Sequence, residues 1–60
     1  MSSKERFIAR NKAVRKFFDD LADKHPFWKQ KHIIEQTAGH YFLAIRTTEA
    51  IINREGIYAD

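Results

Sequence analysis

Apolar residues recur through the first third of the chain at the spacing of an amphipathic helix. Phe7, Val14, Phe18 and Leu21 fall on one face when residues are placed about 3.6 to a turn. The opposite face is polar and carries Lys12, Lys16, Asp19 and Asp23. This pattern predicts a first helix over about residues 3–23.

Local signals mark both ends of this helix. Ser2 and Glu5 have the spacing of a capping box, in which two side chains satisfy free amides at a helix start. Pro26 is the only proline of the chain, and the residue before a proline disfavours helical geometry. We therefore assign His25 to the connection after the first helix.

Two shorter helices follow in the pattern. The second covers about residues 28–41, and its inward face consists of Ile33, Ile34, Ala38 and Tyr41. Residues 43–45 form a short turn, and the third helix covers about residues 46–55. Its inward residues are Thr48, Ile51 and Ile52. Gly56 suits the left-handed position that closes a helix, and residues 57–60 form a tail.

The expected fold is all-α, a single three-helix domain with a helix-turn-helix near its C-terminus. Many simple three-helix bundles share this plan. Trp28 fits either a core plug or a cover over the junction of the first two helices. Ile8 and Phe17 flank the apolar stripe of the first helix, where they either complete the core or form the surface of a homodimer.

Composition narrows the class of protein. Sixty residues make one domain at most, and the absence of cysteine excludes disulfides, thiolate zinc sites and thiol nucleophiles. No apolar run approaches the roughly 20 residues that cross a bilayer. Residues 1–15 lack the apolar stretch of a signal peptide. We expect a cytoplasmic protein with no membrane partner.

Charge is distributed unevenly along the chain, whose formal net charge is +3. The first 16 residues hold one acidic residue, Glu5, and six basic ones, Lys4, Arg6, Arg10, Lys12, Arg15 and Lys16. Acidic residues outnumber basic ones in the remainder. Such a basic segment suits a polyanionic partner, and equally suits a helix face that is only solvated.

The stretch from Ile34 to Arg54 resembles the helix-turn-helix of small bacterial, homeodomain-like DNA-binding proteins. That motif has a small residue where the second helix crosses the first, and an apolar residue in the turn. Ala38 and Leu43 match these positions, and Thr48 and Ile51 match the two inward positions of the recognition helix. The turn of such proteins typically reads Leu-Ser-x-Arg-Thr-Val, and here it reads Leu-Ala-Ile-Arg-Thr-Thr.

The chain departs from that pattern at four positions. Phe42 stands where the turn usually has glycine. Ala44 replaces the usual serine or threonine N-cap, and the loss of a cap costs about 1 kcal/mol. Thr37 and Thr48 stand where valine or isoleucine is commoner. A buried threonine hydroxyl needs a hydrogen-bond partner, which a helix supplies through the carbonyl one turn back.

The resemblance implies that the third helix reads bases in the major groove of DNA. Its groove-facing residues would be Ile45, Arg46, Thr47, Glu49, Ala50 and Asn53. Arginine can donate two hydrogen bonds to guanine, and asparagine can bridge the donor and acceptor of adenine. Arg46 and Asn53 are equally ordinary on an exposed helix surface. Phosphate contacts are expected from six basic residues, Lys29, Lys31, Arg6, Arg10, Lys12 and Arg54.

Other chemistry has little support in the sequence. His32, Glu35 and His40 are spaced over two helical turns and do not converge as metal ligands. No nucleophile with its base and no glycine-rich phosphate loop is present, so we expect neither an enzyme nor a cofactor, metal or small-molecule substrate. The leading hypothesis is a transcriptional regulator that binds double-stranded DNA. The alternative is a small adaptor or antitoxin-like interaction module, which predicts a contiguous exposed apolar patch.

Overall fold

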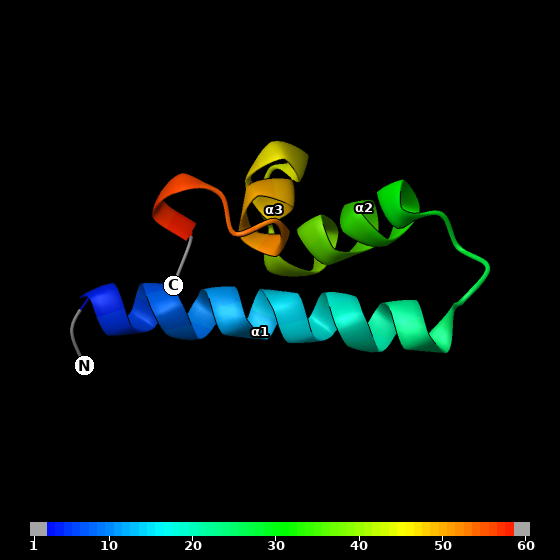
Figure 1. Cartoon of the computed structure of the whole chain (residues 1–60), viewed down its shortest axis with the longest axis horizontal. Coiled ribbons are helices and arrows are strands. Elements are labelled where there is room, and N and C mark those ends of the chain that lie inside the picture. Colours follow the sequence, from blue (N-terminus) through cyan, green and yellow to red (C-terminus); the bar gives the residue numbers. More distant parts are fainter. Residues whose placement is uncertain (1–2, 59–60) are drawn as a thin grey trace.

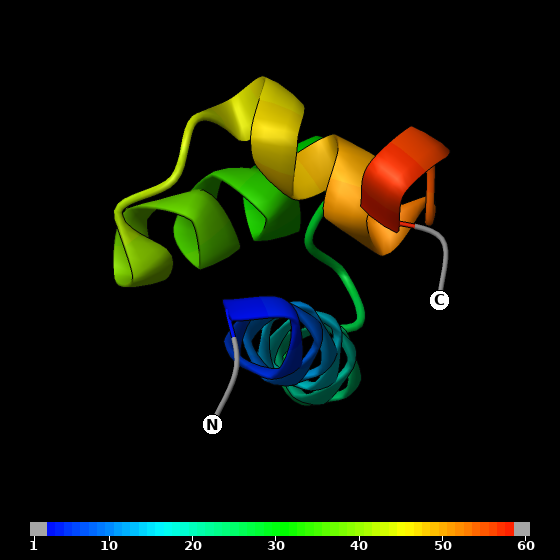
Figure 2. The ribbon, with the colours of Figure 1, turned by 90° about the vertical axis from the view of Figure 1, so that its left-hand side faces the viewer.

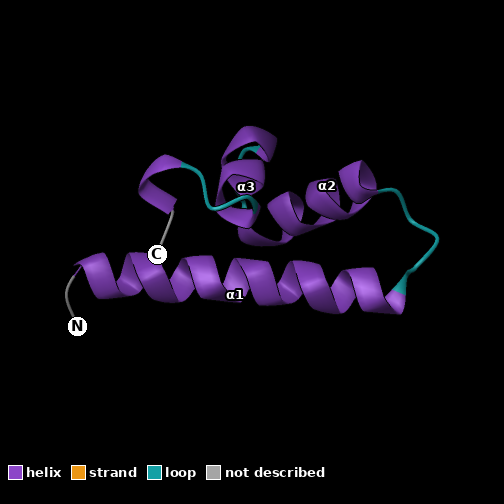
Figure 3. Ribbon diagram, in the orientation of Figure 1, coloured by secondary structure: helices purple, strands orange, loops and turns teal. Residues whose placement is uncertain are grey.

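The computed structural model describes residues 3–58, and the regular structure of this part is entirely helical (Figure 3). Three α-helices follow one another: α1 (Ser3–Lys24), α2 (Gln30–Tyr41) and α3 (Ile45–Ile52). One turn of 3-10 helix, η1 (Gly56–Tyr58), comes after α3. The prediction of an all-α, three-helix fold is confirmed. None of the helices is long and apolar enough to cross a membrane.

The helix α1 is a base on which the other helices rest. Figure 1 shows α1 along the whole length of the molecule, with α2 and α3 on one side of it. Figure 2, which looks along α1, shows the same arrangement from its end. Each of the three helices contacts the other two, and η1 contacts α3. Within residues 3–58, one face of α1 is therefore free of contacts with the other helices.

A small core lies where the three helices meet. Its buried apolar residues are Val14, Ile33, Ile34, Ala38 and Ile51. The larger members of the predicted inner face of α1, Phe7, Phe18 and Leu21, are only half-buried. The predicted face is correct, but α2 and α3 are shorter than α1 and cover its large side chains only in part.

Two buried threonines satisfy their hydroxyl groups inside their own helices. The Thr37 hydroxyl donates to the carbonyl of Ile33 at 2.8 Å, and the Thr48 hydroxyl donates to the carbonyl of Ala44 at 3.0 Å. Both residues are fully buried. The expectation that the carbonyl one turn back would serve as partner is confirmed. Among the described residues, every buried side-chain nitrogen or oxygen has a hydrogen-bond partner.

The start of α2 differs from the prediction by two residues. The helix begins at Gln30, whereas residue 28 was expected. The N–H of Trp28 instead bonds to the carbonyl of His25 at 3.0 Å, which forms a turn around Pro26. Trp28 therefore belongs to the connection between α1 and α2.

The third helix begins one residue earlier than predicted and ends three residues earlier than predicted. Ile45 is its first residue and not part of the turn, and Ile52 is its last. Arg54 adopts a left-handed conformation with φ 55°, and the N–H of Glu55 bonds to the carbonyl of Ala50 at 2.9 Å. This bond pattern closes a helix, so Arg54 and not Gly56 is the closing residue.

The segment after α3 folds back onto α1. Gly56, with φ 53°, opens η1. The ring of Tyr58 then stacks on Phe7 with 5.4 Å between centroids. The expectation of a tail is therefore wrong for Ile57 and Tyr58. Residues 59–60 and Ser2, with its predicted capping box, lie outside the described residues.

Candidate nucleic-acid interface

The turn between α2 and α3 depends on a left-handed residue, Phe42, with φ 55° and ψ 41°. Its N–H bonds to the carbonyl of Gly39 at 3.4 Å, and the N–H of Leu43 bonds to the carbonyl of Ala38 at 2.9 Å. These bonds satisfy carbonyls at the end of α2. The side chain of Phe42 is 95% exposed. The turn thus has the backbone geometry that suits glycine, although a phenylalanine occupies it.

The inner face of α3 is held by small and medium side chains. Ala38 of α2 is 3% exposed, which fits the close crossing expected of a helix-turn-helix. Thr48 and Ile51 of α3 are fully buried, and Leu43 in the turn is half-buried. These residues were predicted to hold the two helices together, and their burial agrees with that prediction.

The last turn of α3 is also fixed to α1. The guanidinium Nη1 of Arg15 donates to the carbonyl of Ile51 at 3.3 Å. A cation near the C-terminal end of a helix is favoured by the helix dipole. Arg15 therefore has a structural role, although from the sequence we assigned it only to the basic segment of the first 16 residues. The first turn of α3, by contrast, lies on the side of the molecule away from α1 (Figures 1 and 2).

The outer face of α3 carries most of the predicted base contacts. Four of the six predicted residues are exposed, namely Ile45, Arg46, Glu49 and Asn53. Thr47 and Ala50 are half-buried. Arg46, Ala50 and Asn53 are spaced four and three residues apart, so they follow one side of the helix. Asn53 directly follows the last helical residue.

Three of the predicted phosphate contacts lie beside the helix-turn-helix. Lys29 and Lys31 are exposed at the start of α2, and Arg54 is exposed two residues after the end of α3. In Figure 1 the first turn of α2, like that of α3, lies away from α1. The first turns of α2 and α3 therefore both lie on the side of the molecule away from α1.

The three predicted contacts on α1 lie in different surroundings. Arg10 is half-buried, and its Nη2 donates to Oδ1 of Asn11 at 3.1 Å. Lys12 is exposed two residues before the fully buried Val14, which places it on the opposite face of α1. Arg6 is exposed on the flank of the helix. A surface that includes α3 therefore does not include Lys12.

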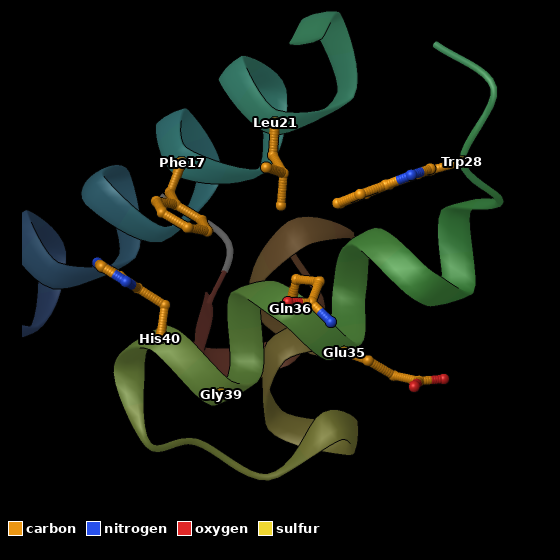
Figure 4. Close-up of a pocket in the computed structure, with 7 residues that line it drawn as sticks. All are labelled: Phe17, Leu21, Trp28, Glu35, Gln36, Gly39 and His40. Atoms are coloured by element: carbon orange, nitrogen blue, oxygen red, sulfur yellow. The ribbon is translucent and has the colours of Figure 1, made fainter. Parts of the chain in front are cut away.

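A separate cleft of about 420 Å³ opens between α2 and the C-terminal half of α1 (Figure 4). It is lined by Phe17, Leu21, Trp28, Glu35, Gln36, Gly39 and His40. Figure 4 shows Phe17 and Leu21 directed toward it from α1 and Trp28 directed toward it from the connection before α2, while the Glu35 carboxylate points away. The cleft does not involve α3.

Several side chains that line or border this cleft take part in aromatic contacts with one another. The ring of Phe17 stacks on His40 with 4.3 Å between centroids, so Phe17 takes part in packing within the monomer. Trp28, 37% exposed, stacks on His25 at 3.7 Å and meets the edge of His32 at 4.5 Å. Trp28 is therefore a cover over the helix junction. Within residues 3–58, no three potential metal ligands gather in one place.

Two polar groups were not predicted from the sequence, namely a buried asparagine in α1 and a tyrosine hydroxyl in α2 that bonds to α1. Asn11 is 2% exposed, although the sequence analysis gave it no role. Its spacing of four residues from Phe7 and three from Val14 already places it on the apolar face. The Tyr41 hydroxyl donates to the carbonyl of Ala13 at 3.2 Å. That contact joins positions 28 residues apart and had no local signal.

Comparison of the chain with protein-family models, with curated proteins and with solved structures gives no match.

Proposed function

We propose that the protein binds double-stranded DNA by placing α3 in the major groove, and that it acts as a transcriptional regulator. The observation that supports this proposal is the division of α3 into two faces. Thr48 and Ile51 are fully buried, whereas Arg46 and Glu49 are exposed on the other side. A helix that is anchored on one face and polar on the other is suited to enter a groove.

The polar side chains of this face are available to a ligand. Among the described residues, no hydrogen bond or ion pair engages the side chains of Arg46, Glu49 or Asn53. Arginine can read guanine, glutamate can accept from cytosine, and asparagine can read adenine. The small side chain of Ala50 lies among them and permits a close approach to bases.

The large exposed apolar side chains bear on the alternative, a protein-interaction module. The large ones occupy three separate segments. Phe27 and Trp28 lie in the connection after α1, Phe42 lies in the turn before α3 with Ile45 at the start of that helix, and Ile57 lies in η1. An interaction module was expected to gather such residues into one patch.

A titration of the protein against mixed-sequence duplex DNA at several salt concentrations tests the proposal. Release of counterions makes the logarithm of the affinity fall linearly with the logarithm of the salt concentration. We expect such a fall, with the slope reduced by about 1 in the variant Lys31→Ala if that lysine contacts a phosphate. An absence of binding at low salt, or an affinity that does not depend on salt, contradicts the proposal.

The variant Arg46→Ala tests the role of α3 within that proposal. We expect it to lose about 1–3 kcal/mol of discrimination at one base pair, because a bidentate contact to guanine is removed. Lys16→Ala is the matched control, since it removes one positive charge from the exposed face of α1. Equal base preference in Arg46→Ala and the parent protein would show that α3 is not the recognition helix.

A further inference from the structure

An apolar side chain lies at the start of the proposed recognition helix. Ile45 is the first residue of α3 and is 44% exposed, whereas Thr48 and Ile51 of the same helix are fully buried. It lies one quarter of a turn from Arg46 and one turn from Glu49. The core of the protein therefore leaves much of the Ile45 side chain uncovered, beside side chains suited to base recognition.

The charge around Ile45 favours a nucleic acid over an apolar protein surface as its partner. Its neighbour Arg46 is exposed, and Lys29 and Lys31 are exposed at the start of α2, whose first turn, like that of α3, lies away from α1 in Figure 1. Glu49 is the one acidic side chain of this face, and the basic Arg46 is next to Ile45, so a partner that presents negative charge near an apolar group suits this end of α3. In the major groove only thymine offers an apolar group, its 5-methyl, among polar base edges and close to phosphates.

We propose that Ile45 recognises the 5-methyl group of a thymine, so that the preferred DNA site contains thymine near the guanine read by Arg46. This inference rests on the proposed function and adds one element of base specificity to it. The contact is apolar and needs no hydrogen bond. Removal of the methyl group, with all hydrogen-bonding groups kept, is therefore its most direct test.

Deoxyuridine supplies that test, because it differs from thymidine only by the absent methyl group. The preferred site is first selected from a pool of random duplexes with the parent protein. Each thymine of the selected duplex is then replaced by deoxyuridine, one at a time, and the affinity is measured. Since a buried methyl group is worth about as much as a methylene, we expect a three- to fivefold loss of affinity at one or two positions.

The variant Ile45→Ala connects this loss to the proposed residue. It should bind the thymine and deoxyuridine duplexes with equal affinity at the position concerned. Ile57→Ala is the matched control, because Ile57 is 76% exposed in η1 and outside α3. This control should keep the discrimination of the parent protein. 5-Methylcytosine at the same position should bind the parent more tightly than cytosine does.

The outcomes separate this inference from the proposed function. Loss of affinity with deoxyuridine in the parent, absent in Ile45→Ala, supports the contact. Salt-dependent DNA binding in which no deoxyuridine substitution matters overturns the inference and leaves the proposed function standing. The same holds if Ile45→Ala keeps the full discrimination. An absence of binding to any duplex overturns both, and the test of the parent protein does not depend on the folding of a variant.

Discussion

Phe42 shows how one residue sets the geometry between α2 and α3. Its φ of 55° lies in the left-handed region, which costs a residue other than glycine or asparagine roughly 1–2 kcal/mol. Its side chain is 95% exposed, so packing of the ring offsets little of this strain energy. The conformation persists because Leu43 and Ala38 fix the turn by their backbone bond of 2.9 Å.

We expect the variant Phe42→Gly to be more stable than the parent protein. Glycine adopts a positive φ at no steric cost, although it also gains freedom in the unfolded chain. The net gain should be about 0.5–1 kcal/mol in the free energy of unfolding. Urea denaturation, followed by far-ultraviolet circular dichroism, measures this difference.

Phe27→Gly is the matched control for that prediction. Phe27 is 96% exposed, and it is not among the described residues with a positive φ. Glycine there should bring no gain, because no strain is relieved. A parent protein that is more stable than Phe42→Gly would mean that the exposed ring contributes more than the strained backbone costs.

At the scale of the element, α3 is a helix that depends on its neighbours. It has eight residues, and helices of this length are marginal in water without tertiary packing. Its N-cap, Ala44, has the extended geometry of a capping residue, with φ −66° and ψ 148°, but makes no side-chain cap. The packing of Thr48 and Ile51 and the bond from Arg15 therefore supply stability that the helix start lacks.

A pair of variants at Ala44 should separate helix stability from DNA binding. Ala44→Ser and Ala44→Asp should each raise the free energy of unfolding by about 1 kcal/mol, because both side chains accept from the first amides of α3. The aspartate also adds a negative charge at the end of α3 that we propose to enter the groove. DNA affinity should therefore stay unchanged in Ala44→Ser and fall in Ala44→Asp. Equal affinity in the two stabilised variants would argue against DNA contact at this end.

The elements were more predictable from the sequence than their ends. The apolar spacing located all three helices, because each buries a face that repeats every 3.6 residues. The end of α3 was misplaced because glycine is the usual closing residue, and Gly56 was the nearest one. In the structure Arg54 closes the helix and Gly56 has a second positive φ, at the start of η1. The position of a left-handed residue depends on where packing ends, which local sequence does not reveal.

At the scale of the whole molecule, contacts between distant segments determine how the candidate surface is supported. Arg15 reaches the end of α3 across 36 positions, and Tyr41 reaches Ala13 across 28. The exposed residues of the candidate site were identified from the motif. The sequence already placed Lys12 on the polar face of α1, opposite the apolar stripe, but it gave no signal that Arg10 bonds to Asn11.

The contact between the rings of Phe7 and Tyr58 also joins distant segments, because it connects the first part of α1 to η1. The rings stack with 5.4 Å between centroids, and Tyr58 is half-buried. Pairs of this kind contribute about 0.5–1.5 kcal/mol beyond the area they bury.

Tyr58→Ala should therefore destabilise the protein by at least about 1 kcal/mol, which lowers the thermal midpoint of a domain this small by roughly 4–8 °C. Ile57→Ala, at a 76% exposed neighbour, should change the midpoint little. Equal midpoints for Tyr58→Ala and the parent protein would mean that η1 adds nothing to the fold, and α1 would then support α3 through Val14 and Arg15 without help from the C-terminal segment.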